Sequence, residues 1–456
     1  MNFGIYKMKK ELIKNTTLLT LSNFLTRFVG LAFFIVLARM LSVENYGSFR
    51  YLLSLSLTYS ILFTGFTVAL TKYISETKNK KTRSEFFSNS LVITLILLFV
   101  TILLSFLLNE NPLLLSLFLF ASYIDFFYIG LIRGLLNYKK LTFFKLTENL
   151  IQFIIMLLAY LIYKEINFIT AVIFFAFSGI ISLLILELIR KSEIKFSLKF
   201  ISKDKVKTLS KYALPVMLGA VGWELMFNLN AIFIKLLLNL EEVAFYSVGR
   251  TITQVFTFLP LAITTIMMPK VSQTKNKLKI VRYTKYAVIV NLVVSFLGLF
   301  ILLIIGKQVI NIAFGSAYLQ AYNVLFYLSL GQIFIASYLI YGSVWQGLGK
   351  PIVPSLILLF ACIINIVGNL ILIPSHGIVG ASISTAISSF IAFISSLSAS
   401  ISSVSFQDSY SAAEIRTAAG EPLTVITYSS KRFLALSTKS ASSSLAFDMG
   451  NVCVIE

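Results

Sequence analysis

Residues 21–40 read LSNFLTRFVGLAFFIVLARM. This run is apolar and long enough to form a helix that crosses the hydrocarbon layer of a membrane. Arg27 lies near its centre, where a permanent charge costs roughly 3 kcal/mol even on insertion scales that penalise it least. The chain must therefore supply a partner for this arginine or use its charge for function.

The composition extends this membrane signal to most of the chain. Of the 456 residues, 57% are hydrophobic and only 13% are charged, and the mean hydropathy is +0.88. Such values exceed those of soluble globular proteins, so we expect an integral membrane protein. The two cysteines and the single histidine are too few for a disulfide framework or a histidine metal site, and we expect neither a cofactor nor a metal.

Apolar runs of spanning length recur along the sequence, separated by short polar segments. They predict twelve helices, over residues 15–41, 49–73, 87–108, 112–132, 143–163, 167–189, 209–238, 243–268, 284–305, 319–345, 352–374 and 377–400. The fold class we expect is an all-α integral membrane protein with about twelve transmembrane helices.

Basic residues are distributed unevenly between the two ends of these helices. With a cytoplasmic N-terminus, 28 of the 39 lysines and arginines fall on the cytoplasmic side, whereas the outer loops hold only Lys164 and Lys307. Basic loops resist translocation, so both termini should be cytoplasmic and the chain multi-pass in the cell membrane. The net charge of +20 then reflects topology and contact with membrane lipids, and no nucleic-acid partner is expected.

A long basic segment divides the predicted helices into two halves. We expect a cytoplasmic segment over 1–14, six-helix bundles over 15–189 and 209–400, and a basic linker over 190–208. Residues 401–456 are rich in Ser, Ala and Thr and should form a weakly ordered polar cytoplasmic tail. FIVLARMLSVENYGSFR from Phe34 aligns with AIFIKLLLNLEEVAFYS from Ala231 at a shift of 197. This repeat predicts two bundles related by a pseudo-two-fold axis along the membrane normal.

Five basic residues are not explained by orientation: Arg27, Arg39, Arg50, Lys235 and Arg250. The shift of 197 relates Arg27 to Glu224, so opposite charges should lie at matching depth on either side of a central cavity. A buried structural ion pair is the alternative to a functional role. For Arg39 and Arg50, extension of the side chain to the outer headgroups is as good an explanation as substrate binding.

Polar residues inside other spans extend the set of candidates. Asn23 and Asn228 each lie one helical turn from a predicted cavity charge and join the substrate-binding set of Arg27, Glu224, Arg250, Arg39 and Arg50. Asp125 and Glu148 are candidates for coupling to H⁺ or Na⁺, because desolvation favours a carboxylate that exchanges its proton near neutral pH. Structural pairing, for one of them with Arg133, is the alternative.

Three segments resemble the polysaccharide-flippase (O-antigen type) branch of the multidrug/oligosaccharidyl-lipid/polysaccharide exporter superfamily. They are LARMLSVENYGSFR from Leu37, LLLNLEEVAFYSVGR from Leu236 and QGLGKP from Gln346. The resemblance covers roughly residues 10–400. It implies a transporter, not an enzyme, that moves a lipid-linked oligosaccharide by alternating access for polysaccharide biosynthesis. It also implies cavity arginines that meet a polyprenyl pyrophosphate, and association with a polysaccharide polymerase or glycosyltransferases.

Three other functions remain open from the sequence. An ion-coupled drug or metabolite antiporter would share the fold, although an arginine-rich cavity suits cationic compounds poorly. A membrane polysaccharide polymerase needs a larger outer loop with catalytic carboxylates than connections such as NLEE provide. A purely structural scaffold does not account for charges at matching depths in the two halves.

Overall fold

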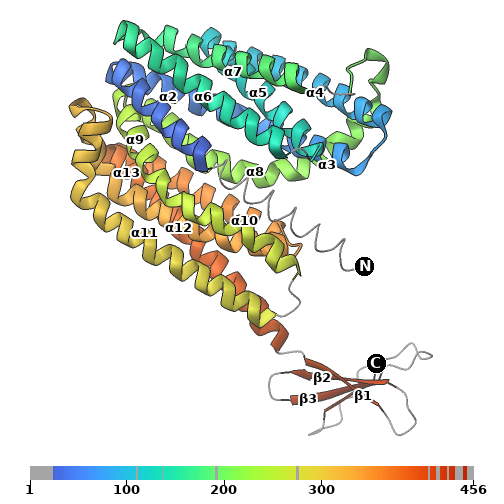
Figure 1. Cartoon of the computed structure of the whole chain (residues 1–456). Coiled ribbons are helices and arrows are strands. Elements are labelled where there is room, and N and C mark those ends of the chain that lie inside the picture. Colours follow the sequence, from blue (N-terminus) through green and yellow to red (C-terminus); the bar gives the residue numbers. More distant parts are fainter. Residues whose placement is uncertain are drawn as a thin grey trace.

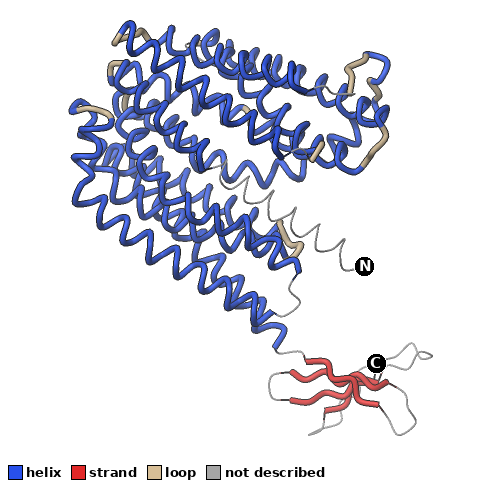
Figure 2. The backbone as a smooth tube through the Cα atoms, viewed as in Figure 1, coloured by secondary structure: helices blue, strands red, loops and turns tan. Residues whose placement is uncertain are grey.

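The computed structural model describes residues 24–108, 111–136, 138–190, 194–273 and 277–408, followed by four short strands. The described chain up to residue 408 is almost entirely helical (Figure 2). Asn23 and the expected segment 1–14 lie outside the described residues.

The first half begins with a helix over residues 24–40. Six helices follow: α2 (Val43–Tyr59), α3 (Ile61–Glu76), α4 (Lys80–Leu108), α5 (Pro112–Gly134), α6 (Tyr138–Tyr163) and α7 (Phe168–Arg190). Ser42 begins α2 by accepting a hydrogen bond from the Asn45 amide at 3.3 Å, as an N-cap does. Helices α2 and α3 form one bent pair, with an angle of 53° between them.

The second half follows a 3₁₀ turn, η1 (Leu198–Phe200). Its elements are α8 (Lys203–Leu237), α9 (Leu240–Thr253), η2 (Gln254–Thr257), α10 (Phe258–Gln273), α11 (Lys277–Ala313), η3 (Ser316–Ala321), α12 (Tyr322–Gly347) and α13 (Ile352–Asp408). Asn239 begins α9 by accepting a hydrogen bond from the Glu242 amide at 2.9 Å. This cap lies 197 residues after Ser42, at the shift that aligns the two halves of the sequence.

Eight helices in the described part of the chain are long and apolar enough to cross a membrane, or nine if the bent pair of α2 and α3 is one span. The sequence predicts about twelve. One reason for the difference is that the two ranges expected at 352–374 and 377–400 form the single element α13, kinked at Gly377 (φ 58°). Another is that α7 contributes only a shorter apolar segment, Phe168–Ser182. The chain is thus an all-helical membrane protein with eight or nine candidate spans.

Helix α8 joins the two groups of helices in Figure 1, because it packs against α3 as well as α13. Two glycines allow the closest approaches between the groups. A Cβ atom on Gly47 of α2 would lie 1.8 Å from the Leu240 carbonyl oxygen of α9, and one on Gly65 of α3 would lie 2.3 Å from the Ala213 oxygen of α8. Glycine at such crossings lets helix backbones touch, which is how helices associate in a membrane.

Aromatic packing fixes the first group internally. The ring of Phe49 on α2 meets Phe118 on α5 edge to face at 5.2 Å, and Phe118 lies 5.1 Å from Phe175 on α7. Phe33, on the helix over 24–40, completes the cluster at 5.9 Å from Phe175. Four helices are therefore held together by one set of rings.

Four short strands follow α13 in the C-terminal part of the chain. Four strands, β1 (Ser411–Arg416), β2 (Pro422–Tyr428), β3 (Lys431–Leu436) and β4 (Leu445–Asp448), pair antiparallel in the order β1-β2-β3-β4. Short runs such as LTVIT and RFLAL favour strands, although Ser and Ala dominate the overall composition. In Figure 1 the sheet lies beyond the end of α13.

Candidate functional site

A cavity of about 270 Å³ lies between the two groups of helices. Residues from the helix over 24–40, α8, α9, η2, α10 and α12 contribute to its wall: Arg27, Trp223, Phe227, Arg250, Gln254, Thr257, Leu261, Gln332 and Leu339. Two of the five arginines and lysines that orientation leaves unexplained therefore line one cavity, although 223 residues separate them in the sequence.

Arg27 reaches across the cavity to the second half of the chain. Its Nη1 donates a hydrogen bond to Thr257 Oγ1 at 3.2 Å, and its guanidinium lies 6.0 Å from the centre of the Phe258 ring. A hydroxyl partner leaves the positive charge uncompensated. Among the described residues, Arg27 forms no ion pair with Glu224 within 4 Å, so the structure does not join the two charges that the repeat relates.

Glu224 instead lies near Arg250, on neighbouring helices of the second half. Asn228 Nδ2 donates to Glu224 Oε2 at 2.9 Å, and the carboxylate attracts the Arg250 guanidinium from beyond ion-pair distance. Arg250 Nη1 donates to the Phe227 carbonyl at 2.7 Å and approaches Asn228 Oδ1 at 3.5 Å. Glu224 therefore interacts within its own half of the chain and not with Arg27, because a sequence alignment does not fix the rotation of a helix about its axis.

Arg50 is buried in the interface between α2 and α9. Its residue is only 7% exposed, its guanidinium lies 4.2 Å from the centre of the Phe34 ring, and it is close enough to Arg250 for the two charges to repel one another. Arg50 Nη1 and Arg250 Nε are buried and have no hydrogen-bond partner in the part of the chain that the structure describes. The Arg50 guanidinium is thus buried between helices.

The structure does not bring Arg39 into this cavity. Arg39 Nε donates to the Ala313 carbonyl at 2.9 Å and Nη2 donates to the Asn311 carbonyl at 3.0 Å. These carbonyls are at the C-terminus of α11, where the helix dipole and unpaired acceptors favour a cation. Nearby, the Tyr318 hydroxyl donates to the Ala38 carbonyl at 3.1 Å. Arg39 thus joins the two halves at the ends of their helices.

Asp125 and Glu148 come together, with a lysine between them. Lys145 Nζ lies 2.9 Å from Asp125 Oδ2 and 3.5 Å from Glu148 Oε2, which places α5 and α6 in direct ionic contact. The sequence counts Lys145 among the basic residues of the cytoplasmic side, although the residue falls at the start of the helix predicted over 143–163. Its spacing of three from Glu148 on one helix is the signal that could have identified the contact.

A second polar cluster joins α8, α9 and α13, and all its members are buried. Asn230 Nδ2 donates to Tyr246 Oη at 2.8 Å and to Thr385 Oγ1 at 3.1 Å, while Asn369 Nδ2 donates to Asn230 Oδ1 at 2.6 Å and to Asn365 Oδ1 at 3.0 Å. In this structure Asn369 of α13 therefore bonds a neighbouring helix, as amides in membrane helices do. Asn230 was missed because only Asn228, one helical turn from Glu224, has a spacing that relates it to a charged residue.

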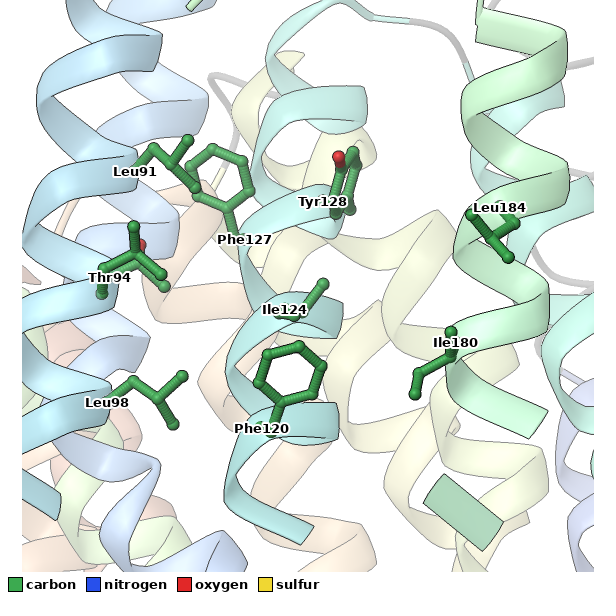
Figure 3. Close-up of a pocket in the computed structure, with 10 residues that line it drawn as sticks. Leu91, Thr94, Leu98, Phe120, Ile124, Phe127, Tyr128, Ile180 and Leu184 are labelled. Carbon is green, nitrogen blue, oxygen red and sulfur yellow. The ribbon is translucent and has the colours of Figure 1, made fainter. Parts of the chain in front are cut away.

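A larger cavity of about 310 Å³ differs in chemistry from the arginine site. It lies among α4, α5 and α7 and is lined by aliphatic and aromatic side chains, including Leu98, Phe120 and Leu184 (Figure 3). Thr94 and Tyr128 contribute its polar atoms. No charged side chain lines this cavity, in contrast to the one that contains Arg27 and Arg250.

A family model described as "Polysaccharide biosynthesis protein" matches residues 12–275, more than half of the chain. An uncharacterized membrane protein of Methanocaldococcus jannaschii is 23% identical over 404 residues, covering 84% of this chain and 96% of that protein. The Haloferax volcanii "Probable low-salt glycan biosynthesis flippase Agl15" is 26% identical over 200 residues, which cover 43% of this chain and 42% of the flippase.

Solved structures share the fold at low sequence identity. A multidrug resistance transporter of the MATE family, MOP superfamily, in an inward-facing conformation superposes with a TM-score of 0.68 at 14% identity, covering 84% of this chain and 95% of that chain. The lipid II flippase MurJ in an inward closed conformation also gives 0.68 at 14% identity, covering 84% and 87% of the two chains. The chain therefore has the fold of MOP superfamily transporters.

Proposed function

We propose, from the premise that the chain belongs to the polysaccharide biosynthesis protein family, that it is a flippase. Its substrate would be an oligosaccharide linked to a polyprenyl pyrophosphate, moved from the inner to the outer leaflet by alternating access. Family membership and the transporter fold agree with the prediction that the chain is not an enzyme.

One observation supports the substrate class above all others: positive charge is held in and beside a cavity without matching acceptors. Arg27 and Arg250 line the cavity and Arg50 lies beside Arg250, whereas Glu224 attracts only Arg250 among these arginines. In the described part of the chain, Arg50 and Arg250 also retain buried N–H groups without partners. Buried donors of this kind are normally satisfied, so the site favours an anion. A guanidinium binds phosphate oxygens through two parallel hydrogen bonds, and a pyrophosphate diester offers one negative charge on each phosphate.

The size of the cavity suggests which part of the substrate it holds. About 270 Å³ accommodates a diphosphate but not a whole oligosaccharide. The sugars therefore require the two halves to separate, and the contacts between α2 and α9 and between α3 and α8 must change during transport. In this proposal the arginines bind the invariant pyrophosphate, which places little restriction on the sugar.

The proposal includes a topology finer than the eight or nine candidate spans. We infer twelve transmembrane helices in two six-helix bundles related by a pseudo-two-fold axis along the membrane normal. The equivalent caps at Ser42 and Asn239 support this repeat. The chain would lie in the cytoplasmic membrane with both termini inside, where its basic loops would face the enzymes that assemble the substrate. Contacts with a polysaccharide polymerase or glycosyltransferases follow from that placement.

A cation gradient is the proposed source of energy, with Asp125 and Glu148 as the coupling groups. Lys145 supplies one positive charge against two carboxylates, so a single H⁺ or Na⁺ would neutralise the cluster. Movement of α5 against α6 would change the distance from Lys145 to Asp125 and thus the affinity for the ion.

The test is transport of lipid-linked oligosaccharide into vesicles that contain the purified chain. Arg250→Ala should lower the outward rate at least tenfold, because it removes a binding group that contacts the pyrophosphate. Arg250→Lys keeps the charge but not the two-point geometry and should restore only part of the rate. Arg27→Gln should act in the same direction as Arg250→Ala.

Lys350→Gln, which removes an exposed charge outside the cavity, is the matched control and should transport normally. Normal transport by Arg27→Gln and Arg250→Ala would eliminate the arginine mechanism. Export of a cationic drug with no movement of lipid-linked sugar would favour the antiporter instead.

A further inference from the structure

Residues 194–202, the described part of the connection between α7 and α8, are hydrogen-bonded to the first turns of α4. Ser84 Oγ accepts from the Lys195 amide at 3.2 Å, and Ser88 Oγ accepts from the Ser197 amide at 3.1 Å. Both polar atoms of the Asn89 side chain are hydrogen-bonded. Its Nδ2 donates to the Phe200 carbonyl at 2.8 Å, and its Oδ1 accepts from the backbone amide of Ser202, the N-cap residue of α8, at 2.9 Å. The connection has a defined position, although it is not a long regular element.

The sequence of α4 indicates where this connection lies relative to the hydrocarbon layer of the membrane. After Asn89 and Ser90, α4 continues with the uninterrupted run LVITLILLFVTILLSFLL to Leu108. At 1.5 Å per residue this run is about 27 Å long, close to the roughly 30 Å of the hydrocarbon layer. The serines and asparagine that hold the connection therefore lie just outside that layer, at the level of the lipid headgroups.

Apolar and basic side chains alternate on the outer side of this segment. Phe196, Leu198 and Ile201 are 45%, 72% and 39% exposed. Exposed lysines recur at every fourth position through the connection and the first turns of α8: Lys195, Lys199, Lys203, Lys207 and Lys211. We call these eight residues the linker surface.

Nearby charges leave this surface strongly positive. Asp204 is the only acidic residue between positions 194 and 211. The sixth lysine of the stretch, Lys205, faces the protein instead, with Nζ 3.4 Å from Glu85 Oε2 and 4.4 Å from the centre of the Phe86 ring. One lysine thus fastens α8 to α4, while the other five face away from that contact.

We propose that the linker surface binds anionic phospholipid headgroups of the adjacent leaflet. Phe196, Leu198 and Ile201 enter the boundary between headgroups and acyl chains, as the apolar side chains of interfacial segments do. The lysines contact the phosphates around them, each contributing roughly fivefold to affinity for a negative surface. Because the segment connects the two halves, bound anionic lipid would hold the end of α8 beside α4. This inference is independent of the transported substrate.

The experiment measures which lipids the full chain retains when it is released from nanodiscs that contain equal amounts of phosphatidylglycerol and phosphatidylcholine. Native mass spectrometry should show more phosphatidylglycerol than phosphatidylcholine on the wild-type chain. The variant Lys195→Gln/Lys199→Gln/Lys203→Gln should lose at least about tenfold in this preference. The side chains are exposed, so folding should be unaffected.

A matched control removes three basic charges from the start of α11, with Lys279→Gln/Arg282→Gln/Lys285→Gln, and should retain most of the preference. A wild-type chain without preference, or an equal loss in both variants, would overturn the proposal. Displacement of the lipid by millimolar inorganic phosphate would also overturn it, because a free-phosphate site does not need the membrane.

A second measurement tests whether lipid binding depends on the hydrogen bonds that hold the linker surface in place. Ser88→Ala/Asn89→Ala removes the groups that hold the connection but no charge, and it should lower the preference for phosphatidylglycerol by weakening the alignment of the lysines. Unchanged retention in this variant would show that the fixed geometry is irrelevant and would contradict the proposal.

Discussion

The contact between α2 and α9 at Gly47 yields the sharpest prediction. In the variant Gly47→Ala, the added methyl carbon would lie 1.8 Å from the Leu240 carbonyl oxygen, 2.8 Å from the Leu240 carbonyl carbon and 3.3 Å from the Ala244 nitrogen. Carbon and carbonyl oxygen normally approach to about 3.3 Å. All three obstructing atoms belong to the backbone, so no side-chain rotation relieves the overlap and the helices must separate by roughly 1.5 Å.

Separation of this size affects the stability of the chain and its arginine site. Overpacking costs about 1–3 kcal/mol where side chains can adjust, and a backbone obstruction should reach about 3 kcal/mol. For a half of the chain, about 200 residues long, the corresponding decrease in melting temperature is about 6–12 °C. Arg50 and Arg250 lie on these two helices, so the binding of pyrophosphate should weaken as well.

Two assays check the prediction: the melting temperature in detergent and outward transport of lipid-linked oligosaccharide. Gly342→Ala is the control, because its new Cβ would meet only Pro354 Cβ at an ordinary 3.7 Å. It should be neutral or slightly stabilising, since alanine is the better helix former. If Gly47→Ala matches the wild type in both assays, the reasoning about this crossing is wrong.

Three further substitutions and one truncation test other contacts. Arg39→Gln removes the cap from α11 and should lower stability by about 1–2 kcal/mol in denaturant titrations, without lowering affinity for pyrophosphate. Lys145→Met leaves two carboxylates unpaired and should cost about 3 kcal/mol, much of it recovered by adding Asp125→Asn. Asn369→Leu breaks the buried amide cluster and should cost about 1–2 kcal/mol by thermal unfolding. Truncation after residue 400 should leave membrane insertion and transport intact, as judged by reconstitution.

Each of these has an outcome that contradicts it. Loss of pyrophosphate binding in Arg39→Gln would place that residue in the site after all. Failure of Asp125→Asn to rescue Lys145→Met would show that the lysine acts other than through charge balance. An unaltered melting point in Asn369→Leu would mean that water or a rearranged amide replaces the lost hydrogen bonds. Failure of the truncated chain to insert would make the C-terminal strands part of the folding unit.

Most apolar runs that were predicted as spans form helices, because transfer into a membrane is governed by local composition. The apolar run after Ser90 forms the long apolar part of α4. Other apolar runs form helices for the same reason, because a backbone in lipid must satisfy its own hydrogen bonds. The number of spans was predicted less well than their positions. A kink at Gly377 and the bend between α2 and α3 depend on how neighbouring helices pack, which hydropathy does not report.

By itself, the sequence identified a membrane protein, predicted that its two halves repeat, and singled out Arg27 and Arg250 as charges that membrane orientation does not explain. Only the tertiary structure decided which charges meet. It directed Arg27 to Thr257 instead of Glu224, placed Lys145 between two carboxylates, and left Arg50 buried beside Arg250. The physical reason is that spacing along a helix fixes the depth and relative face of its residues. The rotation of that face toward a partner depends on close contacts such as that at Gly47, which no single helix contains.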